Sequence, residues 1–278
     1  MKLRARPIAP GHATGTALVS PAPFSFVGGA DPTTGEILDP QAGAGERLSG
    51  RIFAFPQGKG STVGSYVIYG LAKRGVGPAA IVNSAAEGII AVGATLAGIP
   101  LVDRFDVGGL RTGDRLIVDG TRGTLELPDV RAVHVVTALL RNQGRILIVR
   151  RSEKVGSFRG RWSAVSGYLE GREVPKTRAV REIREETGIR GAIFRAASSP
   201  VLARDDATMY VVHPFLFDVP GRRVRLDWEN VEHRWIRPTD LDRYDTVPRL
   251  RDVVAAALST SNSKSPTRTR STRRPRPR

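Results

Sequence analysis

Five glutamates and several arginines share one short stretch of the sequence, between Gly167 and Ile189. Carboxylates are the side chains that hold hard divalent cations, so this concentration of acids is the first candidate for chemistry. Pro175 suits the first turn of a helix, and Gly188 suits the left-handed residue just past a helix end. We therefore expect a helix from about residue 174 to residue 187.

The acids of this expected helix converge on one edge of it. At about 100° per residue, Glu182, Glu185 and Glu186 fall in one arc, which borders an apolar face containing Ala179 and Ile183. Like charges three and four residues apart destabilise a helix by about 0.2 to 0.5 kcal/mol per pair, so a cation should lie among them. The spacing predicts Mg²⁺ or Mn²⁺. The alternative is a solvated helix laced by arginine–glutamate pairs, which is what most charge runs are.

The full spacing of Gly167, Glu173 and the run REIREETGI at 181–189 resembles the Nudix box. The resemblance implies an α/β/α sandwich that hydrolyses a nucleoside diphosphate linked to another moiety. It implies that the metal ligands are Glu182, Glu185 and Glu186. It also implies catalytic roles for Glu185 and for Arg181, which would orient a glutamate, while Glu173 would support the site from its loop. Metal ions in such a site lower the pKa of an attacking water and neutralise the diphosphate.

The rest of residues 131–258 supplies the strands that such a helix needs. We expect strands at 132–140, 145–150, 209–217, 222–226 and 232–236, and a closing helix at 248–258. Basic residues ahead of the box are candidates for gripping phosphates, although a basic surface explains them equally well. These are Arg150, Arg151, Lys154, Arg159 and Arg161, of which we assign Arg150 and Arg161 to substrate binding. Either Glu229 or Glu232 is a candidate general base, and Trp162 is expected in the core.

Residues 1–129 are rich in glycine and in short β-like runs, which predict a small layered β/β/α unit. We expect strands at 16–19, 51–55, 79–82, 115–118 and 123–127, and helices at 63–74 and 88–97. The stretch GKGSTVGS at 58–65 leads from a strand into a helix, so it offers backbone N–H groups and a positive helix end to an anion. Lys59 would strengthen such a site, and Ser61 or Thr62 would cap the helix. A tightly turning, capped helix start without a ligand is the alternative.

Several stretches taken together resemble the small subunit, or swivel domain, of aconitase X. They are SFVGGADPTTG at 25–35, the loop at 58–65, GPAAIV at 77–82, AGIP at 97–100 and GDRLIVDG at 113–120. The resemblance implies a swivelling β/β/α domain of a dehydratase, acting on mevalonate 5-phosphate or on hydroxyproline. It implies that Ser61 is the catalytic base that removes a proton beside the substrate carboxylate, in a loop where Gly58, Lys59 and Gly60 bind substrate. It also implies an iron-sulfur cluster on a separate large subunit, which this chain needs as a partner.

Composition sets limits on the chemistry. The chain has no cysteine, so any thiolate-bound iron-sulfur cluster must come from a partner, and its four histidines have no metal-binding spacing. The net charge of +16 is uneven: residues 1–129 hold 12 basic against 11 acidic side chains, residues 130–258 hold 24 against 16, and residues 259–278 hold 7 against none. We interpret residues 259–278 as a disordered basic tail, which gives nucleic-acid binding only weak support. No secretory or membrane-spanning pattern is found, so a cytoplasmic protein is expected.

The leading hypothesis from the sequence is a fusion of an aconitase X swivel domain, residues 1–129, with a Nudix hydrolase domain, residues 131–258. The Nudix half would act on a small phosphate-bearing metabolite, with an isoprenoid phosphate suggested by the proximity of the two domains. The alternatives are a Nudix domain that binds a ligand without catalysis and regulates the dehydratase, and a nucleic-acid-binding protein that acts through its tail. Intact box glutamates argue against a pure binder.

Overall fold

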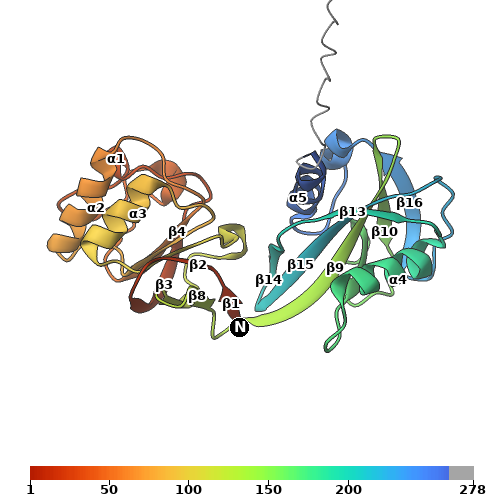
Figure 1. Ribbon diagram of the computed structural model, residues 1–278, viewed down its shortest axis with the longest axis horizontal. Coiled ribbons are helices and arrows are strands. Elements are labelled where there is room, and N and C mark those ends of the chain that lie inside the picture. The colour runs from red at the N-terminus through yellow and green to blue at the C-terminus, as the bar shows by residue number, and fades with distance from the viewer. Residues whose placement is uncertain (263–278) are drawn as a thin grey trace, which may run out of the picture. The chain divides into compact units, whose positions relative to one another are not determined.

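The structure is a computed structural model that describes residues 1–262. Its contacts divide it into two compact units (Figure 1). The first unit comprises Met1–His134 and Pro200–Val211, and the second comprises Val135–Ser199 and the chain from Val212 onward. The segment 200–211 belongs to the first unit because its side chains Leu202, Met209 and Val211 are buried in that unit's core. From sequence we expected a single domain boundary near residue 130, which would leave residues 200–211 in the second domain.

The first unit is built on a mixed eight-stranded sheet in the order β1-β8-β7-β3-β4-β5-β6-β2, with parallel pairing from β3 through β6. Its strands are β1 (Lys2–Arg4), β2 (Arg6–Ala9), β3 (His12–Val19), β4 (Arg51–Phe55), β5 (Ala80–Asn83), β6 (Leu101–Asp103), β7 (Arg115–Asp119) and β8 (Thr124–Glu126). Its helices are the single turn α1 (Phe26–Gly29), α2 (Val63–Lys73) and α3 (Gly88–Ala97), with short 3₁₀ turns at Pro40–Ala42 and Val107–Gly109.

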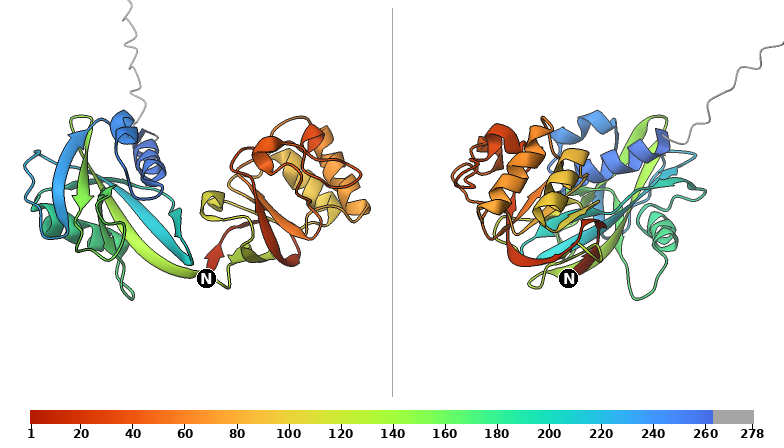
Figure 2. Two further views of the ribbon diagram at one scale, coloured as in Figure 1. Left: turned by 180° about the vertical axis from the view of Figure 1, so that it is seen from behind. Right: turned by 60° about the vertical axis from the view of Figure 1, so that its left-hand side comes forward.

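Both faces of this sheet are buried. Along β4, Phe53 and Phe55 point to the face covered by α2 and α3, while Ile52 and Ala54 point to the opposite face. Successive side chains of a strand alternate between faces, so a strand covered on both sides is apolar throughout, as RIFAF is after its first residue. The helices lie together on one side of the sheet (Figures 1 and 2). The predicted layered β/β/α unit is confirmed.

The second unit is an α/β/α sandwich, as predicted. Five strands lie wholly within it: β10 (Arg145–Arg151), β11 (Trp162–Ser163), β12 (Val165–Tyr168), β13 (Ile193–Ala197) and β16 (Asn230–Ile236). Most of β9 (Arg131–Asn142) and of β15 (Thr208–Asp218) also belongs to it, but residues 131–134 and 208–211 lie in the first unit. The strand β14 (Val201–Asp205) lies in the first unit and pairs with β15. The helices of the second unit are α4 (Pro175–Thr187) and α5 (Leu250–Asn262), with a 3₁₀ turn at Pro238–Arg243. In β10, Leu147 and Val149 face the core under α4, and Ile146 and Ile148 face the core under α5.

Two sequence predictions about elements were wrong. Residues 222–226 form no strand, because their polar groups bond to other partners: the Arg225 N–H donates to the carbonyl of Thr187, and the Arg222 guanidinium donates to Asn142. The closing helix does not end at 258 but continues to Asn262. Within this last part, the hydroxyls of Ser259 and Thr260 donate to the carbonyl of Ala256.

Residues 259–262, which were predicted to belong to a disordered tail, are therefore part of α5. The rest of the predicted tail, residues 263–278, lies outside the described residues. The helices α4 and α5 have 13 residues each. Within residues 1–262, no helix is long and apolar enough to cross a membrane.

Candidate active site

Helix α4 is positioned by its two ends and by one apolar stripe. Val174 precedes it in an extended conformation, Pro175 fills its first turn, and Gly188 ends it at φ 64° while donating to the carbonyl of Arg184 at 3.0 Å. Ala179 and Ile183 are buried against the sheet. The predicted helix is confirmed, and its glutamates lie along the edge of the buried face.

Glu186 is the most deeply held of these acids. Its Oε1 accepts from the backbone N–H of Ser166 at 2.9 Å, and its Oε2 accepts from the side-chain amide of Asn230 at 2.8 Å. The carboxyl is 4% exposed, and this burial raises its pKa to about 8 against the lowering effect of the two donors. Glu186 therefore connects α4 to both β12 and β16.

Glu182 is also buried and lies against the backbone of β12. A Cβ on Gly167 would overlap the Glu182 carboxylate, so only glycine fits at this position of the box. Glu182 forms an ion pair with Arg178, yet within the described residues its buried Oε1 has no well-aligned hydrogen bond. Burial raises the pKa of Glu182 to about 6, the positive charge of Arg178 lowers it, and the charges of Glu185 and Glu229 raise it.

Glu229, from the segment before β16, joins the same cluster. Burial raises its pKa first, and the charges of Asp227 and Glu185 raise it further, while Arg151 lowers it. The structure thus brings Glu229 to the box glutamates. Glu232, the other candidate base, instead forms ion pairs with Arg234 at 2.7 Å and with Arg150 at 3.7 Å.

The cluster suits a hard divalent cation by its donor chemistry, because carboxylates are hard ligands and these acids repel one another. The charges of Glu185 and Glu229 raise the pKa of Glu182, and the charges of Glu182 and Glu229 raise the pKa of Glu186. The positions of these side chains do not themselves form a metal site. Among residues 1–262, no three histidine, aspartate or glutamate side chains come together closely enough to hold a metal ion. The metal ligands therefore stay a prediction.

The remaining residues predicted around the box have other partners. Arg181 donates to Glu173, so it steadies the loop, while Arg178 is the arginine paired with a helix glutamate. Arg161 pairs with Asp245 at 3.7 Å. Trp162 is 9% exposed and lies in the core under α5, as expected.

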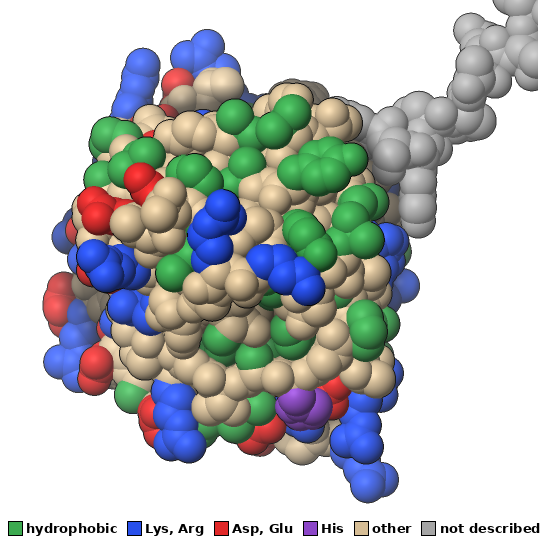
Figure 3. Space-filling view, turned by 90° about the vertical axis from the view of Figure 1, so that its left-hand side faces the viewer, with side chains coloured by type: hydrophobic (Ala, Val, Ile, Leu, Met, Phe, Trp, Pro, Cys, Tyr) green, Lys and Arg blue, Asp and Glu red, His purple; other side chains and the backbone are tan. Residues whose placement is uncertain are grey.

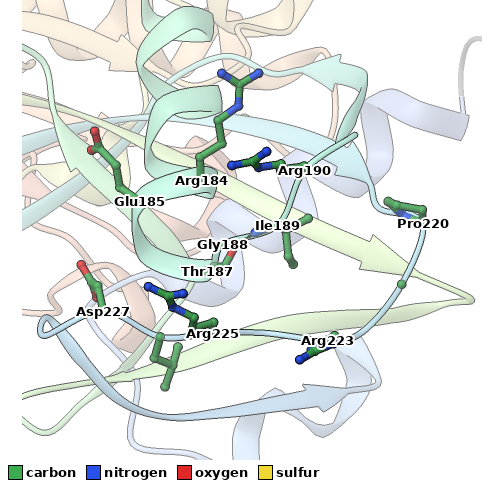
Figure 4. A pocket seen from close by; sticks show the side chains of 12 residues that line it. Arg184, Glu185, Thr187, Gly188, Ile189, Arg190, Pro220, Arg223, Arg225 and Asp227 are labelled. Atoms are coloured by element: carbon green, nitrogen blue, oxygen red, sulfur yellow. Dashed lines mark hydrogen bonds between the residues drawn. The ribbon is translucent and has the colours of Figure 1, made fainter.

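Glu185 borders a groove of about 950 Å³ between the end of α4 and the segment 220–227 (Figure 4). Sequence reasoning missed the basic residues that line this groove. The arginines are Arg184, Arg190, Arg223 and Arg225. Their clustering could not be found from sequence, because residues 222–226 were expected to form a strand.

In the first unit, the loop 58–65 makes the predicted tight entry into α2. Gly60 has φ 110°, and a Cβ on Gly58 would come within 2.6 Å of Ile90, so both glycines are needed for the close approach. Ser61 is exposed, and its hydroxyl accepts from the Val63 N–H at 3.4 Å. Thr62 makes no capping bond through its side chain. Lys59 reaches Asp39 at 3.7 Å.

An apolar surface borders this loop on α2 and α3. The exposed side chains are Val63, Tyr66, Tyr69, Val92 and Leu96, with Tyr66 73% exposed. Figure 3 faces the side of the structure that carries these helices and shows apolar side chains gathered on it. Exposed apolar area of this kind is typical of an interaction surface.

The chain has two domains: a mixed sheet that carries a glycine loop, and an α/β/α sandwich that carries a helix rich in glutamate. Comparison with known families identifies both: residues 2–127 match the aconitase X swivel domain model, and residues 130–257 match the NUDIX domain model. The chain belongs to the aconitase X swivel family, and its relatives there are phosphomevalonate dehydratase small subunits. A Nudix domain follows in the same polypeptide. Both resemblances stated from sequence are confirmed.

The curated relatives match the first domain. The phosphomevalonate dehydratase small subunit of Pyrococcus furiosus is 56% identical over 128 residues, 46% of this chain and 96% of the relative, and that of Methanocaldococcus jannaschii is 52% identical over 46% of this chain and 98% of the relative. Among solved structures, holo aconitase X of Thermococcus kodakaraensis is 47% identical, covers 46% of this chain and 98% of its own, and has a TM-score of 0.45. A MutT protein of Methanosarcina mazei is 26% identical, covers 49% of this chain and 99% of its own, and has a TM-score of 0.42.

Proposed function

We propose that this chain is the small subunit of an aconitase X-type dehydratase, joined to a Nudix domain that hydrolyses a diphosphate-linked substrate. The observation that carries the first half is the 56% identity over 96% of a phosphomevalonate dehydratase small subunit. The second half rests on the mutually coupled carboxylates of α4 and Glu229.

In the dehydratase, the Ser61 hydroxyl acts as the base that removes a proton beside the substrate carboxylate. Its place just before α2 sets it at the positive end of the helix, which stabilises the alkoxide form. Lys59, on the same loop, offers its ammonium group to a carboxylate or phosphate of the substrate. The iron-sulfur cluster of a large subunit would supply a Lewis acid for the departing hydroxyl. Mevalonate 5-phosphate is the favoured substrate, which would place the chain in isoprenoid biosynthesis, and hydroxyproline is the alternative.

The apolar surface on α2 and α3 supports a large-subunit partner. It lies beside the loop that carries Ser61, so a subunit bound there would cover the loop and exclude water from it. Exposed tyrosines such as Tyr66 are favoured at interfaces, because the ring buries much area with little loss of conformational entropy.

Co-expression with an aconitase X large subunit tests the dehydratase half. The complex should convert mevalonate 5-phosphate to the corresponding α,β-unsaturated acid, the Ser61→Ala complex should lose this activity while still assembling, and Ser49→Ala, an exposed serine elsewhere in the unit, should retain it. An active Ser61→Ala complex would remove the serine from this role. An assembled wild-type complex that dehydrates hydroxyproline alone would select the alternative substrate.

In the Nudix domain, Glu182, Glu185 and Glu186 would hold Mg²⁺ or Mn²⁺, and Glu229 would accept the proton of the attacking water. The metal, when bound, would supply a Lewis acid that lowers the pKa of a water and neutralises the diphosphate. The raised pKa of Glu229 brings its basicity closer to neutral pH, where a general base is most effective. Arg181 fixes the loop through Glu173. Because Glu186 has a pKa of about 8, it must lose its proton before it can bind metal, so metal binding should release protons below that pH.

Phosphate release from a panel of diphosphates, including isoprenoid diphosphates, tests the hydrolase half. Wild-type protein with Mg²⁺ should release phosphate, and Glu185→Gln, an exposed position whose exchange leaves the core intact, should reduce the rate at least about 100-fold. Calorimetric titration with Mn²⁺ should show binding to wild type that is weakened in Glu185→Gln. Equal rates in the two proteins would reject the assignment.

Ligand binding without catalysis is the second candidate, and one observation favours it. Both oxygens of Glu186 already have hydrogen-bond donors, from Ser166 and Asn230, so the carboxylate is satisfied without a metal. A pure binder would take up a diphosphate with the same affinity in Mg²⁺ and in EDTA, and would release no phosphate.

A further inference from the structure

The groove beside Glu185 is lined by more basic than acidic side chains. It is formed by the last turn of α4 with the residues after it and by the irregular segment 220–227 (Figure 4). Four arginines and two acids, Glu185 and Asp227, line it. Figure 4 places the guanidinium groups of Arg184 and Arg190 near one another beside the helix, with Arg225 below the helix end.

The four arginines are available for a ligand. All are exposed, and within residues 1–262 none of them is assigned a carboxylate partner, whereas Arg178, Arg195 and Arg204 each have one. Arginine near a helix C-terminus is stabilised by the helix dipole, which accounts for Arg184 in the last turn of α4. That effect fades within one turn and does not explain the arginines of the opposite segment.

Guanidinium groups suit phosphate because their planar N–H forks pair with two oxygens at once. A volume of about 950 Å³ is near the upper end of small-molecule sites, so a nucleotide-sized ligand fits. The groove also borders the carboxylate cluster, since Glu185 lines it and the charge of Glu185 acts on Glu182 and Glu229. A phosphate held by the arginines would therefore lie beside the proposed reaction site.

We propose that this groove binds a small polyanion bearing two or more phosphate groups, namely the uncleaved part of the Nudix substrate. That the ligand is part of a substrate rests on the proposed hydrolase function. That the groove binds phosphate does not rest on it. It predicts that the domain prefers substrates with phosphates beyond the bond that is cleaved.

Binding of inorganic tripolyphosphate, measured by calorimetry in EDTA, tests the groove without any metal or turnover. The variant is Arg223→Ala/Arg225→Ala, whose positions are exposed and outside regular structure, and the control is Arg47→Ala/Arg74→Ala, two exposed arginines of the first unit. We expect the groove variant to bind at least about tenfold more weakly and the control to bind within about twofold of wild type. Residues 263–278 are present in all three proteins, so their charge cancels in the comparison.

The possible results test phosphate binding by the groove separately from hydrolysis by the Nudix domain. Loss of tripolyphosphate binding in the groove variant upholds the groove, even if wild type releases no phosphate from any diphosphate. Equal binding by wild type and groove variant, or no binding by wild type at millimolar concentration, overturns the groove, even if hydrolysis is found. Binding of a short oligonucleotide but not of tripolyphosphate would also overturn it, because the ligand would then be a nucleic acid.

Discussion

The buried carboxyl of Glu186 should make the metal-free second unit less stable as pH rises. The pKa of Glu186 is about 8 in the folded protein against an ordinary value of 4.5, so the folded state binds its proton more tightly than the unfolded state does. The stabilisation is fully present below pH 4.5 and is lost as pH rises through about 8. Replacing Glu186 with glutamine removes this titration, and the Asn230 amide can turn to accept from the new N–H₂ group.

The magnitude follows from about 1.4 kcal/mol per unit of pKa difference. Between pH 6 and pH 8, wild type should lose about 2 kcal/mol through Glu186. The pKa of Glu182 is about 6, so its contribution falls mainly below this range. Histidines also titrate here, but they are the same in wild type and Glu186→Gln, so the difference between the two slopes isolates Glu186.

Urea unfolding in EDTA, followed by tryptophan fluorescence, measures this difference. All three tryptophans, Trp162, Trp228 and Trp235, lie in the second unit, so the signal reports that unit alone. Glu153→Gln, an exposed acid of the same unit, is the control and should keep the wild-type slope. A Glu186→Gln protein with the wild-type slope, or a wild type that gains stability between pH 6 and pH 8, would refute the reasoning.

Three substitutions test the packing around the site and the first core. Gly167→Ala should destabilise the second unit by about 1 to 3 kcal/mol in urea, because the new Cβ overlaps the Glu182 carboxylate, and an unchanged midpoint would contradict the close approach. Arg178→Ala should cost about 3 to 5 kcal/mol by leaving buried Glu182 without its cation, and a cost below about 1 kcal/mol would mean that the pair is solvated. Gly109→Ala should lower the stability of the first unit by about 1 to 3 kcal/mol, measured by hydrogen exchange in β14, because its Cβ overlaps Leu202, and unchanged protection there would contradict this contact.

The helix of the box shows which features local sequence can predict. Its start at Pro175 and its end at Gly188 depend on the fixed φ of proline and the freedom of glycine at positive φ, which act within a few residues. The strand RIFAF and the helix at 88–97 were predicted for similar reasons. The bounds agree because local conformational preference and burial favour the same structure.

The segments that sequence reasoning misjudged depend on distant partners. Residues 222–226 have strand-like composition, but the Arg225 N–H bonds to the end of α4 and Arg222 bonds to Asn142, so no neighbouring strand pairs with them. The hairpin at 200–211 lies in sequence within the Nudix match, yet Leu202 and Met209 are buried in the first unit. Neither outcome can be predicted from side-chain periodicity alone.

The sequence by itself determined the two families, the box helix and the three glutamates on its edge, because spacing along a helix fixes which side chains share a face. Only the tertiary structure decided the surroundings of those glutamates: that Glu186 is enclosed by Ser166 and Asn230, that Glu229 joins the cluster, and that arginines from two segments line one groove. The physical reason is that burial and charge coupling depend on distances through space, which chain spacing does not specify across a sheet and an irregular segment.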